Sequence, residues 1–340
     1  MQPACWPCDG SWATDWGCCR YAAFVVAPPT IDDIREAHER IGSVVHRTPV
    51  LTCSSLDRLT GCKLFVKGEH LQGVGAFKFR GATNAVLSLS DVEAKRGVCT
   101  HSSGNHAQAL ARASLERGIQ AWIVMPTSAP GVKRRAVEGY GATVVDCEPT
   151  LQAREDTASQ IVEETGAIFI HPYDDPRIVA GAGTAAVELL EEVPDLDVII
   201  APVGGGGLMS GTCLAASAMK PGIRLIGVEP KGADDAARSL VAGERILQRS
   251  PNTICDGLLT SLGQLTWPIL RDHLETIVTV SDDLVVEAMR LLWTRAKAVV
   301  EPSGATPLAA VLSQESPIQP GTRVGLILSG GNVDLDNLPW

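Results

Sequence analysis

The sequence lacks any apolar run long enough to cross a bilayer, and it is short of positive charge. Its apolar stretches stop at glycine or proline before the roughly 20 residues that a membrane-spanning helix needs. Lysine and arginine number 29 against 39 acidic residues, which gives a formal net charge of -10. Such a surface repels phosphate backbones and anionic lipids. We therefore expect a soluble, cytoplasmic protein without a nucleic-acid or membrane partner.

The cysteines lack a pairing pattern. Six of the ten follow residue 50 at irregular spacings, as expected for reduced side chains in the cytosol. The other four are crowded, together with three tryptophans, into residues 1–29. They could bind zinc, but their second pair lacks the spacer of usual ligand pairs, so we predict an irregular leader. Its single basic residue, Arg20, argues against a transit peptide. The four are Cys5, Cys8, Cys18 and Cys19.

From Thr30 onward, short strand-like runs alternate with helical stretches, without internal repeats. Thr30 followed by Asp32 and Asp33 predicts a capped helix start with acids in its first turn. Aliphatic and β-branched runs are then separated by stretches rich in alanine, leucine and glutamate, which is typical of parallel sheets covered by helices. The runs lie at 63–67, 98–100, 121–125, 143–146, 198–202, 224–228 and 323–328.

This alternation predicts an α/β fold of two open parallel-sheet lobes with covering helices. We assign 30–96 and 175–340 to a large domain and 97–174 to a small inserted domain, because no linker separates the two clusters of strands. Ligands of open α/β sheets lie beyond the carboxyl ends of the strands. The catalytic site should therefore lie between the lobes.

Four consecutive glycines follow the run at 198–202 and precede a helical stretch at 209–219. Successive amides without side chains at a helix start make a cradle for phosphate. A glycine turn without a ligand is the plainer alternative, but it carries a large cost in backbone entropy. The glycines are Gly204, Gly205, Gly206 and Gly207.

A dinucleotide site is a second interpretation of these glycines. Gly205 and Gly207 begin a helix, and Glu229 ends the next strand where a ribose-binding acid would lie. This interpretation predicts an NAD-dependent oxidoreductase. Against it, the helix glycine, Gly211, is one place too far along the chain.

Lys78 stands between two aromatic residues, Phe77 and Phe79, just before a helical stretch at 82–89. A desolvated lysine has a lowered pKa and is a usable nucleophilic amine. Taken alone, most lysines are solvated surface groups. Lys78 is thus a candidate nucleophile only in the company of other site residues.

A polar loop follows the run at 98–100 and opens a helix. Amides and hydroxyls exposed at such a position bind a carboxylate. The alternative is a capped helix without a ligand. The loop comprises Ser102, Ser103, Gly104, Asn105 and His106.

A fourth segment begins at Ser329, whose hydroxyl at the carboxyl end of a strand is free to meet a ligand. Together, and in this order, the four segments resemble the fold-type II pyridoxal phosphate enzymes, most closely the serine racemase and serine/threonine dehydratase family. The resemblance runs from about Thr30 to the C-terminus. It implies the tryptophan synthase β-like arrangement of two lobes, a small amino-acid substrate and a homodimer.

The resemblance assigns a role to each segment. It implies that Lys78 carries the cofactor, that Phe77 and Asn105 brace its ring, and that the four glycines bind its phosphate. Ser329 partners the ring nitrogen, which favours elimination and racemisation over transamination. Ser102, Asn105 and His106 hold the substrate carboxylate while Lys78 removes the α-proton. Loss of the β-hydroxyl then leads to an oxo acid and ammonia.

Two residues bear on the choice between the activities. Ser103 occupies the place of the second proton carrier of racemases, where many threonine dehydratases have alanine, although it could merely cap the helix. Tyr173 resembles the aromatic residue of the dehydratases, which favours elimination.

Arg154 bears on the substrate. It falls where racemase-like relatives have an arginine near the distal end of the substrate, so 3-hydroxyaspartate is an alternative substrate. A solvated arginine is the other explanation for Arg154.

The resemblance also implies accessory ligands. Glu229, the Ala233 carbonyl and Asp235 would supply oxygens to Mg²⁺ or Ca²⁺, unless they are simple surface acids. Five residues match the nucleotide-activator site of animal relatives. The chain ends at Trp340 without a regulatory domain, so isoleucine feedback is not expected. The activator positions are Gln108, Lys133, Tyr140, Lys297 and Asn332.

Three hypotheses follow. The first is a pyridoxal phosphate dehydratase and racemase, the second an NAD-dependent oxidoreductase, and the third a catalytically silent protein that binds a phosphate ligand.

Overall fold

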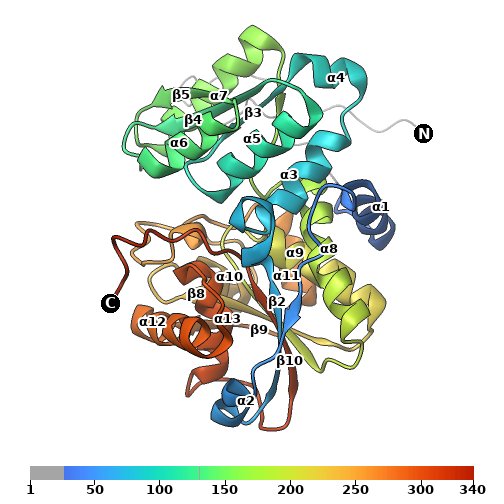
Figure 1. Cartoon of the computed structure of the whole chain (residues 1–340), viewed down its shortest axis with the longest axis vertical. Coiled ribbons are helices and arrows are strands. Elements are labelled where there is room, and N and C mark those ends of the chain that lie inside the picture. The colour runs from blue at the N-terminus through green and yellow to red at the C-terminus, as the bar shows by residue number, and fades with distance from the viewer. Residues whose placement is uncertain (1–26, 130) are drawn as a thin grey trace, which may run out of the picture.

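The computed structural model describes residues 27–129 and 131–340. The predicted leader and its four cysteines therefore lie outside the described residues, apart from 27–29. The described part contains two separate sheets, parallel except for the short edge strand β1, with helices on their faces (Figure 1). The predicted α/β fold class of two open parallel sheets is confirmed.

The larger sheet has six strands among the described residues, in the order β1-β2-β10-β7-β8-β9. Its strands run parallel except for β1, which pairs antiparallel with β2. Their bounds are β1 (Val50–Leu51), β2 (Lys63–Gly68), β10 (Arg323–Leu328), β7 (Val198–Pro202), β8 (Arg224–Pro230) and β9 (Thr276–Val280).

The smaller sheet has four parallel strands in the described chain, in the order β5-β4-β3-β6. All of them lie between residues 98 and 169, whereas the strands of the larger sheet come from either side of this stretch. The bounds are β5 (Thr143–Cys147), β4 (Ala121–Pro126), β3 (Val98–His101) and β6 (Ile168–Phe169).

Helices cover both faces of each sheet (Figure 1). They are α1 (Ile31–Ile41), α2 (Ser54–Thr60), α3 (Lys78–Leu87), α4 (Asp91–Arg96), α5 (Asn105–Arg117), α6 (Gly131–Gly139), α7 (Leu151–Thr165), α8 (Pro176–Glu192), α9 (Gly207–Met219), α10 (Asp235–Ala242), α11 (Thr266–His273), α12 (Asp282–Leu291) and α13 (Pro302–Leu312). Shorter helical turns are η1 (Glu69–Leu71), η2 (Gly73–Gly75), η3 (Asp256–Leu258) and η4 (Leu292–Ala296).

The central strand β7 shows how the larger sheet builds its core. Successive side chains of a strand point to opposite faces. Val198 and Ile200 accordingly pack in one cluster with residues of α12 and α13, and Ile199 and Ala201 pack in another with residues of α8, α9 and α11. Both faces of the strand are buried, which explains its continuous apolar sequence.

Helices α8 and α9 pack closely through glycine. A side-chain carbon on Gly211 would lie 2.4 Å from the Val179 carbonyl oxygen and 2.8 Å from the Gly183 Cα. Gly211 thus serves the contact between two helices that flank the site, which accounts for its unusual spacing after the glycine run.

The predicted elements agree with the structure in place and type, with one informative difference in bounds. The capping box at Thr30 and Asp33 is present. The helix expected at 82–89 begins four residues earlier, so Lys78 is the first residue of α3. Within the described residues, no helix is both long and apolar enough to span a membrane.

Candidate active site

Lys78 is the first residue of α3, and its amine reaches the segment between β6 and α8. Its Nζ donates a hydrogen bond to the Pro172 carbonyl oxygen at 2.7 Å and lies 5.2 Å from the centre of the Phe77 ring. No acidic partner among the described residues accounts for this placement, and burial lowers the pKa of the Lys78 amine to about 8. The amine is therefore a far better nucleophile near neutrality than an ordinary lysine.

His106 is buried near Lys78. Neither ring nitrogen has a hydrogen-bond partner among the described residues. Burial, followed by the nearby Lys78 charge, holds the pKa of His106 well below the usual imidazole value. Buried polar atoms are normally paired. The unpartnered imidazole thus fits a site where a ligand supplies the missing partner.

The four glycines form a buried turn between β7 and α9. Gly206 is the N-cap with φ +89°, a conformation that favours glycine. A side-chain carbon on Gly205 would lie 2.3 Å from the Tyr173 ring. Within the described chain, the amides of Gly204–Gly207 donate to no protein acceptor, which fits a cradle for phosphate.

The loop that precedes Lys78 is paired with the loop that follows β10. Phe77 N donates to the Ser329 carbonyl at 2.9 Å, and Gly331 N donates to the Gly75 carbonyl at the same distance. Ser329 is buried. The structure therefore brings together the predicted cofactor lysine and the predicted partner of the ring nitrogen, although they are far apart in sequence.

Asn105 begins α5 and reaches a carboxylate that our sequence reasoning missed. Its Nδ2 donates to Glu301 Oε1 at 2.8 Å, and its Oδ1 accepts from Asn332 Nδ2 at 2.9 Å. Glu301 is buried just before α13. The sequence feature that could have indicated this role is the acidic residue inside the apolar stretch at 298–312, because a buried charge requires polar partners.

The loop at 102–105, which we predicted to bind a carboxylate, is partly exposed. Gly104 N donates to Ser102 Oγ at 3.3 Å, and Gly104 is the N-cap of α5. In the residues described, no side chain caps this helix. Ser103 therefore does not cap α5 in the structure, which leaves its hydroxyl available for another role.

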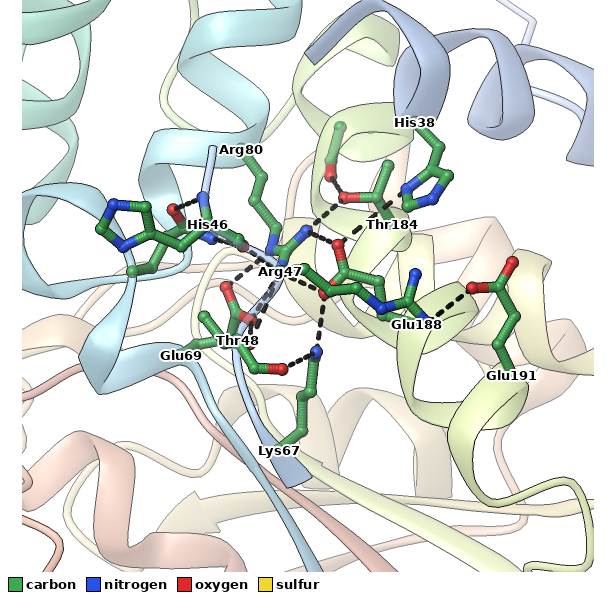
Figure 2. Close-up of polar contacts among 12 residues, drawn as sticks. His38, His46, Arg47, Thr48, Lys67, Glu69, Arg80, Thr184, Glu188 and Glu191 are labelled. Carbon is green, nitrogen blue, oxygen red and sulfur yellow. Dashed lines mark hydrogen bonds and ion pairs between the residues drawn. The ribbon is translucent and has the colours of Figure 1, made fainter. Parts of the chain in front are cut away.

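A buried ion-pair network anchors the helix that presents Lys78 (Figure 2). Arg80, two residues beyond Lys78, donates to both carboxylate oxygens of Glu69 and of Glu188 at 2.7–2.9 Å. Lys67 Nζ donates to Glu188 Oε2 at 2.6 Å. All four side chains are almost fully buried. The network joins β2, η1, α3 and α8 behind the site, and it was not predicted.

The predicted cation ligands lie around the junction of β8 and α10, with Glu229 in β8 and Asp235 as the first residue of α10. Glu229 and Asp235 are both fully buried, and Glu229 accepts from the amides of Ala236 and Ala237 at 3.1 and 2.8 Å. Asp235 Oδ1 has no partner within the described residues. The described residues contain no group of three or more metal-binding side chains. The Ala233 carbonyl and water would therefore have to complete the coordination shell of a cation here.

The remaining predicted residues are more scattered. Arg154 lies near the start of α7, and its buried Nε lacks a partner among the described residues. Lys133 pairs with Asp256 at 2.5 Å, and Lys297 Nζ donates to the Thr294 carbonyl. Tyr140 lies under the Arg112 guanidinium, and Gln108 is buried in α5. Of the predicted activator positions, only Asn332 is bonded to a predicted cofactor residue, Asn105, in the described structure.

A reactive lysine at a helix start, a glycine cradle and two parallel sheets define an α/β enzyme that uses a phosphate-bearing cofactor. The family model "Pyridoxal-phosphate dependent enzyme" matches residues 41–330, and the chain belongs to this family. Pyridoxal phosphate is therefore its cofactor, as the resemblance implied. The NAD-dependent oxidoreductase hypothesis is set aside.

Individual relatives support this assignment. The chain is 50% identical over 312 residues to a beta-hydroxyaspartate dehydratase of Paracoccus denitrificans, covering 92% of this chain and 99% of the relative. The crystal structure of serine racemase from Dictyostelium discoideum superposes with a TM-score of 0.86 at 50% identity, covering 90% of this chain and 99% of that one. The crystal structure of a T.th. threonine deaminase gives a TM-score of 0.86 at 45% identity, covering 91% of this chain and 100% of that one.

Proposed function

We propose that the chain is a dehydratase of small β-hydroxy amino acids, such as L-serine and L-threonine, that also racemises serine. The observation that carries this proposal is the Lys78 amine, which is held at the Pro172 carbonyl with a pKa of about 8 beside an unpartnered His106. An amine with that pKa can give up and take up a proton near neutral pH.

The residues fit pyridoxal phosphate. The unpartnered amides of Gly204–Gly207 would hold its phosphate, Asn105 and Phe77 would brace the ring, and Ser329 would face the ring nitrogen. When bound, the cofactor supplies a conjugated ring that withdraws electrons from the α-carbon of an amino acid. A hydroxyl partner such as Ser329 leaves the ring nitrogen largely unprotonated, which favours elimination and racemisation.

The protein side chains then supply binding and proton transfer. Ser102, Asn105 and His106 would bind the α-carboxylate, and Lys78 would remove the α-proton from one face. The Ser103 hydroxyl, which does not cap α5, would deliver a proton to the other face. Both dehydration and racemisation follow from this arrangement, because each begins with loss of the α-proton.

A second candidate substrate is 3-hydroxyaspartate. The Arg154 guanidinium has a buried Nε without a described partner, and a second carboxylate would satisfy it. A relative named for this substrate class is 50% identical over 312 residues.

Accessory features belong to the same proposal. Two buried carboxylates, Glu229 and Asp235, support a Mg²⁺ or Ca²⁺ site that includes the Ala233 carbonyl. We also infer a cytoplasmic homodimer, a small inserted domain at 97–174 within a large domain of 30–96 and 175–340, and a nucleotide activator. The activator would bind at Gln108, Lys133, Tyr140, Lys297 and Asn332.

The test supplies L-serine, L-threonine and both threo isomers of 3-hydroxyaspartate to the wild-type protein, Lys78→Ala and Lys95→Ala. Oxo acid and D-amino acid are measured together with visible absorption. We expect Lys78→Ala to lose the cofactor's protein-bound absorption and both products. Lys95→Ala, at an exposed lysine of α4, should resemble wild type. Activity and absorption that survive in Lys78→Ala would refute the proposal.

A further inference from the structure

A closed ring of hydrogen bonds joins Asn105, Asn332 and Glu301. Asn105 Nδ2 donates to Glu301 Oε1 at 2.8 Å, and Asn332 Nδ2 donates to Asn105 Oδ1 at 2.9 Å. The Asn332 backbone N–H closes the ring by donating to Glu301 Oε2 at 3.1 Å. Asn105 begins α5, whereas Glu301 immediately precedes α13 and Asn332 lies in the loop after β10. The ring therefore links the two sheets.

Two groups that cannot reverse their roles fix the direction of every bond in the ring. The Val74 carbonyl can only accept, and Asn332 Nδ2 donates to it at 2.8 Å. With Nδ2 on that side, Asn332 can only donate to Asn105, so Asn105 presents its oxygen to Asn332 and its NH₂ to Glu301. The Asn332 backbone N–H likewise can only donate. Both oxygens of Glu301 must therefore accept.

The orientation of Asn332 is also fixed sterically. A side-chain carbon on Gly75 would lie 2.6 Å from Asn332 Oδ1, so the absence of one makes room for that oxygen. Val74 has φ 56°, which is rare for a β-branched residue and is maintained only by surrounding contacts. Through Asn332, the ring is thus bonded to the strained turn at Gly73–Gly75, which precedes Lys78 by a few residues.

Burial of Glu301 disfavours the ionised carboxylate on which the ring depends. Burial, and then the charge of Asp256, raises the pKa of the Glu301 carboxyl to about 8, against the hydrogen bond from Asn105 and the charge of Lys133. Asp256 on η3 and Lys133 on α6 pair with each other, and the Cys255 thiol is the further titratable group nearby. A proton therefore competes with the ring near neutral pH.

We propose that Glu301 is a positioning residue that holds the Asn105 amide in one orientation, and that it releases this amide when its carboxyl takes up a proton. A protonated carboxyl needs an acceptor, and neither Asn105 Nδ2 nor the Asn332 backbone N–H can accept. Asn105 must then rotate, or the ring opens. The inference rests on the proposed function, in which Asn105 braces the cofactor ring.

The test is a double-mutant cycle at two pH values on protein loaded with pyridoxal phosphate. Wild type, Glu301→Gln, Asn105→Ala and the double variant are compared by urea unfolding and by kcat/KM for L-serine at pH 6 and pH 9. At pH 9 we expect Glu301→Gln to lower kcat/KM about ten- to hundredfold, because a buried hydrogen bond to a charged group is lost. At this pH the double variant should have the same kcat/KM as Asn105→Ala, so the effects of the two single substitutions do not add. The urea unfolding midpoints should be non-additive in the same way. At pH 6 the loss in Glu301→Gln should shrink to within about threefold of wild type.

Additive effects at pH 9, or an equal loss in Glu301→Gln at both pH values, would overturn the inference. Glu315→Gln, at an exposed carboxylate, is the matched control and should behave as wild type. If Glu301→Gln does not fold, Glu301→Asp is used instead, because it keeps the charge. This variant should retain the pH-dependent coupling to Asn105, and loss of that coupling would contradict the inference. A wild-type protein without turnover would refute the proposed function, while the unfolding cycle would still report on the ring.

Discussion

The Lys78 amine is held by the carbonyl oxygen of Pro172, at 2.7 Å, rather than by a carboxylate. A carbonyl accepts a hydrogen bond from the neutral and the charged amine alike, so it orients the nitrogen without stabilising its charge as an acid would. Placement of the amine and control of its ionisation are therefore separate, and the ionisation is left to burial.

The first prediction concerns the pH dependence of Lys78. Burial lowers its pKa to about 8, so about a tenth of the amine is neutral at pH 7, against about one in 2,500 for an ordinary lysine. In cofactor-free protein, modification of Lys78 by trinitrobenzenesulfonate should rise through a midpoint near pH 8. Mass spectrometry of the modified peptide measures it, and a midpoint near the ordinary lysine value would contradict the prediction.

The same shift has a consequence for stability. The folded lysine loses its proton at a lower pH than the unfolded one, so the unfolded state binds more protons between about pH 8 and pH 10.5. The contribution of Lys78 to stability should therefore rise with pH across this window. Lys78→Met should lack the rise, which urea unfolding of the cofactor-free proteins would show.

A second prediction compares two glycines. Gly205→Ala places a carbon against the Tyr173 ring and should weaken pyridoxal phosphate binding at least about tenfold, with about 1–3 kcal/mol of destabilisation from overpacking. Gly139→Ala in α6 meets nothing within 4 Å and should leave binding unchanged. Cofactor titration followed by absorbance measures both. Equal affinities for the two variants would argue against the glycine cradle.

The third prediction uses two glutamates of α8, both labelled in Figure 2, of which Glu188 is buried and Glu191 is exposed. Glu188→Gln leaves Arg80 and Lys67 short of a buried counter-charge and should lower the free energy of unfolding by about 3–5 kcal/mol. Glu191→Gln breaks an exposed pair with Arg47 and should cost less than about 1 kcal/mol. Urea unfolding at neutral pH separates the two, and similar losses would mean that the buried network is not stabilising.

The fourth prediction concerns removal of a divalent cation. Chelator should lower the melting temperature, and Mg²⁺ or Ca²⁺ should restore it, since a ligand at about 100 times its Kd stabilises by about 2.7 kcal/mol. Asp235→Asn should abolish this response. Asp234→Asn, at the neighbouring aspartate that pairs with Arg238, should keep it. A chelator response that persists in Asp235→Asn would place the cation elsewhere.

The fifth prediction concerns Ser103. Ser103→Ala should suppress D-serine formation by at least about tenfold while oxo acid formation from L-serine changes little, because only racemisation needs a proton on the second face. Ser114→Ala, at a buried hydroxyl near the far end of α5, should affect neither product. Chiral chromatography and an oxo acid assay give both rates. An equal loss of both products in Ser103→Ala would remove Ser103 from the role of second base.

The sequence was sufficient for the features that depend on short segments. The glycine run follows a strand directly, and Lys78 lies within a local motif, so each could be found without knowing the fold. The start of α3 was misplaced because the glycine and aromatic residues around Lys78 are weak helix formers, whereas packing against α5 and α8 extends the helix to Lys78.

Long-range pairings could not be predicted in the same way. Asn105 and Glu301 are 196 residues apart, and Arg80 and Glu188 are 108 residues apart. These pairs form only once the chain has folded, because Asn105 follows a strand of the smaller sheet while Glu301 lies between two strands of the larger one. A buried charge in the sequence indicates that partners exist, but the identity of the partner depends on the topology.

The balance of charge behind Lys78 limits which substitutions this chain can accept there. Two cations, Lys67 and Arg80, face two anions, Glu69 and Glu188, with almost no access to water. Loss of any one of them leaves an uncompensated buried charge. Tolerated substitutions should therefore replace one cation and one anion together. If the loop at 102–104 binds the substrate as we propose, substitutions in this partly exposed loop can change substrate preference while the helix start that presents the amine stays in place.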